Sequence, residues 1–114
     1  MPFFDNMQPL NGGANDELLT VAGSVASLTK PSVNATAAVI QVVQAGTTDT
    51  TKAVRCTFNG VTPVNSTGTD QVGFLLGERE FWVLKNVKEI NQFRALSADG
   101  SNTNYIYVQY YIDK

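Results

Sequence analysis

Apolar and polar residues alternate along much of the chain with the two-residue period of β-strands. The clearest run spans Thr103 to Asp113. On one side of it fall Ile106, Val108, Tyr110 and Ile112, and on the other Tyr105, Tyr107, Gln109, Tyr111 and Asp113. Because successive side chains of a strand point to opposite faces of the sheet, this pattern predicts a strand with one buried face and one tyrosine-rich face.

Shorter runs rich in β-branched and aromatic residues predict further strands, at residues 19–28, 36–44, 53–58, 72–76, 80–84 and 89–96. Asn59-Gly60 is the strongest hairpin signal between them, since both central residues of a type I′ turn need positive φ. No stretch keeps a 3.6-residue period over three turns, and residues 86–93 allow only a brief helical turn. We therefore predict an all-β fold, a single antiparallel β-sandwich or jelly-roll-like domain.

Residues 1–17 are predicted to form an extended N-terminal arm, and residues 18–114 the β-sandwich domain. In the arm, Phe3, Phe4, Met7 and Leu10 are spaced among prolines and glycines without clean alternation. Two interpretations are open: the arm is a frayed terminus, or it docks on a neighbouring subunit. The adjacent phenylalanines favour docking, because exposed aromatic side chains lower solubility unless a partner covers them.

The charge content is low for a free globular protein. Charged residues make up 16% of the chain, where a quarter is usual, so the composition favours a subunit of an assembly. The eight lysines and arginines are scattered and the net charge is −2, which argues against electrostatic binding of nucleic acid. No apolar run approaches the roughly 20 residues of a membrane helix. The first residues also lack the basic and apolar regions of a signal peptide.

Residue types that carry catalysis are sparse. Histidine is absent, which removes the commonest general base and the commonest zinc ligand. Cys56 is the single cysteine, and its phase with Val54 and Phe58 predicts a core position. The charged triplet at residues 78–80 follows a glycine in a predicted turn, where adjacent side chains diverge instead of converging on a substrate. We expect no enzymatic activity, no metal site and no cofactor.

The aromatic residues suggest a contact surface. Tyr105, Tyr107 and Tyr111 share a face, and tyrosine is enriched at interfaces because it buries a large area at low entropic cost. We expect an interface here, with a half-covered outer sheet face as the alternative. With Trp82 these tyrosines could instead form a platform for sugars, although a tryptophan in a sandwich is more often in the core.

Five short segments carry a resemblance when they are taken in order. Ala-Thr opens residues 35–42, Asn-Gly and Thr-Pro fall in residues 54–63, and Gly-Phe-Leu-Leu-Gly-Glu spans residues 73–78. Phe-Arg-Ala closes residues 90–95, and Tyr-Tyr closes residues 105–111. This ordered set resembles a group of small virion proteins of tailed bacteriophages. A longer loop at residues 45–52 and a loose version of the glycine segment depart from that group's pattern, and the arm lies outside the resemblance.

The resemblance implies a compact β-sandwich in the phage particle and no catalysis. We expect a non-enzymatic virion structural protein, first of all a capsid decoration or cement protein that bridges subunits of the shell. A neck-, tail- or fibre-associated virion protein is the first alternative, and a carbohydrate-binding module is the second. The expected partners are the major capsid protein or other virion proteins, and further copies of the chain in a dimer or trimer. The expected location is the virion, assembled in the bacterial cytoplasm. The residues expected at interfaces are Phe3, Phe4, Met7, Leu10, Tyr105, Tyr107 and Tyr111.

Overall fold

The computed structural model describes residues 7–9, 16–29, 35–45, 53–65, 69–98 and 103–113. Strands dominate these ranges, with one short helix among them. The elements are, in chain order, β1 (Met7–Pro9), β2 (Glu17–Val21), β3 (Ala26–Ser27), β4 (Ala37–Ala45), β5 (Ala53–Thr57), β6 (Phe74–Gly77), β7 (Phe81–Leu84), α1 (Val87–Gln92), β8 (Arg94–Ser97) and β9 (Asn104–Asp113).

The strands form two antiparallel sheets. Sheet A has five strands in the order β1-β9-β4-β7, with β2 also paired to β9, and sheet B has four in the order β3-β8-β5-β6. Most connections along the chain pass from one sheet to the other. The all-β prediction is confirmed, whereas the jelly-roll-like connectivity stays a prediction.

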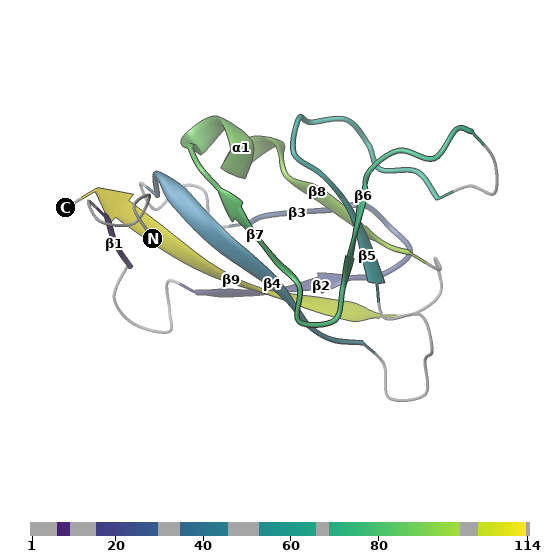
Figure 1. The fold of residues 1–114 in the computed structure, drawn as a ribbon, viewed down its shortest axis with the longest axis horizontal. Helices are drawn as coiled ribbons and strands as arrows, with labels where there is room; N and C mark the ends of the chain where they lie inside the picture. The colour runs from purple at the N-terminus through teal and green to yellow at the C-terminus, as the bar shows by residue number, and fades with distance from the viewer. Residues whose placement is uncertain are drawn as a thin grey trace.

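Strand β9 organises sheet A (Figure 1). It pairs with β2 through its N-terminal half, with β1 through its C-terminal end, and with β4 along its other side. The β4 register shifts between Val42 and Gln44, a β-bulge or similar irregularity. As the sequence predicted for β9, Ile106, Val108 and Tyr110 are buried and Tyr105 and Tyr107 face outward.

The core lies between the two sheets. From sheet A, Ile40, Val42 and Val108 point inward, and Val54 and Cys56 meet them from sheet B, all without solvent exposure. The predicted core position of Cys56 is confirmed. Burial of these side chains supplies the main driving force for folding, since each is worth about 1.5–3 kcal/mol when removed from water.

A buried carboxylate ties β2 to β9 at the margin of this core. Glu17 is 7% exposed, and its oxygens accept hydrogen bonds from the Thr29 N–H at 3.0 Å, the Thr29 hydroxyl at 2.6 Å and the Tyr110 hydroxyl at 2.7 Å. A buried charge is tolerated only when hydrogen bonds replace its water shell. The network therefore fixes Thr29, which follows β3, beside β2 and β9.

Two predicted strands differ from the structure. Residues 19–28 divide into β2 and β3, separated by bends at residues 22–24 that let the chain change sheets. In the first half of the expected strand at residues 89–96 the structure has α1, the brief helical turn that residues 86–93 allow, and β8 forms the second half. Asn86 caps this helix by accepting from the Glu89 N–H at 2.9 Å, and the Glu89 carboxylate accepts from the Lys85 N–H at 2.8 Å. Reciprocal caps of this kind start a helix even where the apolar period is too short to reveal it.

The Asn59-Gly60 hairpin prediction is wrong. Gly60 has φ +82°, but Asn59 is not among the described residues with positive φ, so no type I′ turn forms. The Asn59 side chain accepts from the Val61 N–H at 3.3 Å, which makes a local side-chain turn. The antiparallel partners of β5 are β6, which begins only after residues 58–73, and β8.

The predicted arm contributes to sheet A, since β1 pairs with β9 and β2 begins at Glu17, one residue before the predicted domain boundary. Phe3, Phe4 and Leu10 lie outside the described residues. Docking of the arm on a neighbouring subunit stays a prediction.

We predict that Tyr110→Phe destabilises the protein by about 1.5–3 kcal/mol, because the buried Glu17 carboxylate loses a hydroxyl donor while the ring remains. Urea unfolding monitored by circular dichroism measures this loss. Tyr105→Phe is the matched control on the outer face of the same strand, and it is expected to change stability by less than about 0.5 kcal/mol. Equal effects of the two substitutions would contradict a stabilising role for the Glu17 network.

Candidate interaction surface

The outer face of sheet A, which we call the tyrosine face, carries the side chains of β2, β9, β4 and β7 that point away from the core. Their registers align one residue from each strand in a row: Leu18 opposite Tyr107, Tyr107 opposite Gln41, and Gln41 opposite Phe81. None of these four is charged. Leu18 is 60% exposed and Phe81 57%, so large apolar groups lie open at both ends of the row.

A shallow hollow of about 320 Å³ opens beside this row. It is lined by Leu18, Val43, Tyr105 and Tyr107. Val43 stands at the register shift in β4, where the strand is irregular. The hollow has the apolar walls and tyrosine rim of a site that receives an apolar side chain from a partner.

The described charges near the face stand at its margins. Asp16 precedes β2, and its carboxylate accepts a hydrogen bond from the Tyr107 hydroxyl. This hydrogen bond raises the pKa of Tyr107 above its ordinary value, and desolvation and the negative charge of Asp16 raise it further. The Tyr111 hydroxyl donates to the Gln109 side chain at 3.1 Å. These bonds hold the two phenol groups in fixed orientations, which lowers the entropic cost of using them in a contact.

The outer face of sheet B differs because the β5–β6 loop covers part of it. Arg55 points outward from β5 yet is 8% exposed, and its guanidinium donates to the Asn65 side chain at 2.8 Å and to the Gly73 carbonyl at 3.2 Å. Gly73 has φ +118°, and a Cβ there would lie 2.8 Å from Arg55 Cγ. Only glycine lets the loop pass this close to β5.

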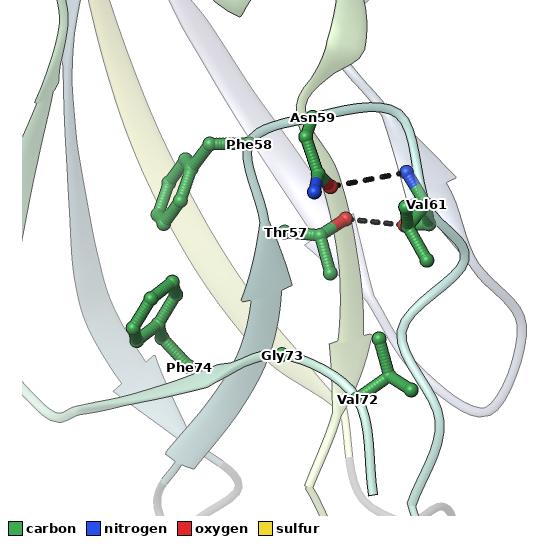
Figure 2. Close-up of a pocket in the computed structure, with 7 residues that line it drawn as sticks. All are labelled: Thr57, Phe58, Asn59, Val61, Val72, Gly73 and Phe74. Atoms are coloured by element: carbon green, nitrogen blue, oxygen red, sulfur yellow. Dashed lines mark hydrogen bonds between the residues drawn. The ribbon is translucent and has the colours of Figure 1, made fainter.

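A second hollow, of about 390 Å³, lies where this loop leaves the end of β5 and where it comes back beside β5 at the start of β6. Figure 2 shows Phe58 and Phe74 on one side of the chain, and Thr57, Val61 and Val72 on the other. The Thr57 hydroxyl donates to the Val61 carbonyl at 2.5 Å. The lining has no ionisable group, so the hollow offers contact area and no acid–base chemistry.

Trp82 is more exposed than the sequence suggested. Its register partner is the inward-facing Ile40, but it lies on β7 at the edge of sheet A and is 46% exposed. It stacks on Phe58 with ring centroids 5.2 Å apart. Since Tyr105 and Tyr107 point from the opposite side of the sheet, Trp82 and the tyrosines do not form the shared platform that the carbohydrate-binding alternative requires.

The described residues offer no metal-binding cluster. No group of three or more Cys, Asp or Glu side chains among them is placed to hold a metal ion. Burial raises the pKa of the Cys56 thiol to about 12, which keeps it protonated and a poor nucleophile at neutral pH. No helix in the described part of the chain is long and apolar enough to cross a membrane.

The structure brings Tyr105, Tyr107 and Tyr111 onto one face, as the alternation of β9 predicted, and places Met7 in β1. It adds Leu18 and Phe81, which the sequence analysis did not single out. The signal for Leu18 is its neighbour Leu19: adjacent residues of a strand face opposite ways, so one of the two leucines must point outward. Comparison with protein-family models, with curated proteins and with solved structures found no match to this chain.

We predict that Asp16→Asn lowers the pKa of Tyr107, because the charged acceptor that favours the protonated phenol is removed. A phenol whose folded pKa lies above its unfolded value stabilises the fold below the unfolded pKa of about 10, and this contribution is lost as pH rises through the folded pKa. Titration of tyrosinate absorbance measures the shift, and Tyr107→Phe assigns the signal. An identical titration in the wild type and Asp16→Asn would contradict the predicted coupling.

Proposed function

We propose that this protein is a non-enzymatic structural protein of a tailed-phage virion, in the first place a capsid decoration or cement protein that binds the assembled shell through its tyrosine face. The observation that carries the proposal is the contrast between the two outer faces. The row from Leu18 to Phe81 is open and uncharged, whereas Arg55 and Thr57 on the other outer face are buried beneath their own loop. An open aromatic face on a chain with few charges is suited to permanent contact with partners.

The area of the tyrosine face indicates how large a contact one copy of the protein can make. The four strands β2, β9, β4 and β7 contain 5, 10, 9 and 4 residues. With a rise of about 3.4 Å per residue and a spacing of about 4.8 Å between strands, they cover about 460 Å². A standard stable interface buries about 800 Å² on each partner. One tyrosine face therefore supplies a modest contact, and firm attachment needs several contacts acting together.

Repetition on a shell provides such additional contacts. A protein that binds only the assembled, expanded shell stabilises that state by mass action. Bridging two capsid subunits converts the second contact into an intramolecular one, so modest single affinities combine as avidity. The major capsid protein is the partner in this proposal, and the virion, assembled in the bacterial cytoplasm, is the location.

A neck-, tail- or fibre-associated virion protein is the alternative, since the same face suits a contact in any of these assemblies. The two proposals differ in stoichiometry. Quantitative mass spectrometry of purified particles, with the major capsid protein as reference, distinguishes them. Hundreds of copies in a simple ratio to the capsid protein are expected for decoration. A dozen or fewer would favour the neck or tail, and absence from particles would contradict both.

Within the decoration proposal, we predict that Leu18→Asp weakens binding to shells stripped of this protein at least about tenfold, because a charge at the contact must be desolvated. Co-sedimentation with the shells measures the affinity. Leu75→Asp is the matched control. Leu75 is 54% exposed, but it lies on the outer face of sheet B, opposite Arg55. Equal binding by the two variants would exclude the tyrosine face as the docking surface.

A further inference from the structure

Strand β7 is an open edge of sheet A. It ends the strand order of the sheet, and no strand in the described part of the chain pairs with its outer side. Its sequence is Phe-Trp-Val-Leu, between Glu80 and Lys85. Natural proteins usually protect such edges with a proline, a bulge or a charge within the strand, because unpaired backbone groups recruit other strands. β7 has no proline and no charge between its ends.

The direction of its backbone groups follows from the ladder with β4. The Val42 N–H donates to the Glu80 carbonyl at 3.0 Å. Bonded and non-bonded positions alternate in an antiparallel pair, so Trp82 and Leu84 are the next residues of β7 that bond to β4. The N–H and C=O groups of Phe81 and Val83 therefore point to the open edge.

The side chains along this edge are exposed as well. A hollow of about 320 Å³ is lined by Phe81, Trp82, Val83 and Lys85. Phe81 and Val83 lie on the tyrosine face, and Trp82 lies on the inner side, so the hollow extends across the strand. An exposed strand with side-chain recesses on both sides is the arrangement that accepts an added strand.

We propose that β7 pairs antiparallel with β7 of a second copy of this chain. A register centred on Trp82 places Phe81 opposite the partner's Val83, and Val83 opposite the partner's Phe81. These two bonded pairs satisfy the outward donors and acceptors of both residues in both copies. Trp82 then faces the partner's Trp82 at a non-bonded position, where cross-strand side chains come closest.

Charge complementarity favours a second copy over an unrelated strand. Residues 78–80 before β7 (Glu-Arg-Glu) carry a net charge of −1, and residues 85–89 after it (Lys-Asn-Val-Lys-Glu) carry a net charge of +1. Antiparallel pairing of identical strands puts the net-negative end of each strand beside the net-positive end of the other. The symmetric pair repeats this match twice, as a two-fold contact requires.

The pairing has a geometric consequence. The two-fold axis runs perpendicular to the sheet, so both tyrosine faces point in the same direction. The dimer presents a continuous sheet of ten strands, two copies of the five in sheet A. Its outer face covers about 900 Å², double the estimate for one copy. The pairing itself does not depend on a role in a virion and is tested on the purified protein alone.

The first test is hydrogen exchange of the unmodified protein at increasing concentration, with the mass determined by sedimentation equilibrium. We expect a dimer, with the Phe81 and Val83 amides exchanging at least about tenfold more slowly than in dilute protein. A monomer at about 1 mM would overturn the proposal, because pairing that weak is not specific. So would a dimer in which these two amides exchange as fast as they do in dilute protein.

The second test removes the outward donor. Val83→Pro deletes an N–H that points to the open edge and leaves the bonds to β4 intact, a position where sheets accept proline. We expect dimerisation to weaken about 10- to 100-fold, since one hydrogen bond is lost in each copy. Val83→Thr, which keeps the N–H and the branched shape, is the control and should dimerise like the wild type. Equal dimerisation of both variants would overturn the proposal, and the exchange experiment decides the question if Val83→Pro does not fold.

Discussion

The two-residue alternation of β9 is the constraint on which the core and the outer surface of sheet A both depend. One side of the strand supplies Ile106, Val108 and Tyr110 to the core, and the other supplies the tyrosines of the outer face. Because β9 pairs with β1, β2 and β4, its register also fixes which side of each of these strands faces inward. A slip of one residue would exchange buried and exposed side chains across much of the sheet. The composition of the outer face is thus set by the same pattern that makes the core.

Buried polar groups hold the connections between the sheets. Glu17 bonds to Tyr110 within sheet A and to Thr29 beyond β3, so one carboxylate holds both ends of the segment that passes from sheet A to sheet B. Asn104 is fully buried at the start of β9, and its amide donates to the Ser97 hydroxyl at 3.0 Å, which joins β9 to β8. The hydrophobic effect is not directional, whereas hydrogen bonds are. These buried hydrogen bonds therefore favour one packing arrangement of the two sheets, which the hydrophobic effect alone would leave less well specified.

The sequence predicts the parts of the fold that depend on local periodicity. The strand over β9, the faces of its residues and the core position of Cys56 all follow from alternation over a few residues. The helix α1 could not be predicted in this way, because six residues are too few to show a helical period and its start depends on the reciprocal caps of Asn86 and Glu89. Whether Asn59-Gly60 closes a hairpin depends on which later strand pairs with β5. The next strand in the chain that does so is β6, which begins only after residues 58–73. The exposure of Trp82 depends on its strand lying at a sheet edge, which no local pattern encodes.

The same limit applies to the candidate surface. Alternation identifies the tyrosines, but only the strand order shows that Leu18 and Phe81 extend their row to both edges of sheet A. It also shows that the loop tied to Arg55 covers part of the opposite outer face, where Leu75 stays exposed. Among the described residues, the tyrosine face is the broader open aromatic surface. The β7 edge bounds that same face, and an added strand there would enlarge the face without covering it. Edge pairing and face contact are therefore compatible in one assembly, because they use different groups: the backbone of Phe81 and Val83 for the first, and the side chains of the tyrosine face for the second.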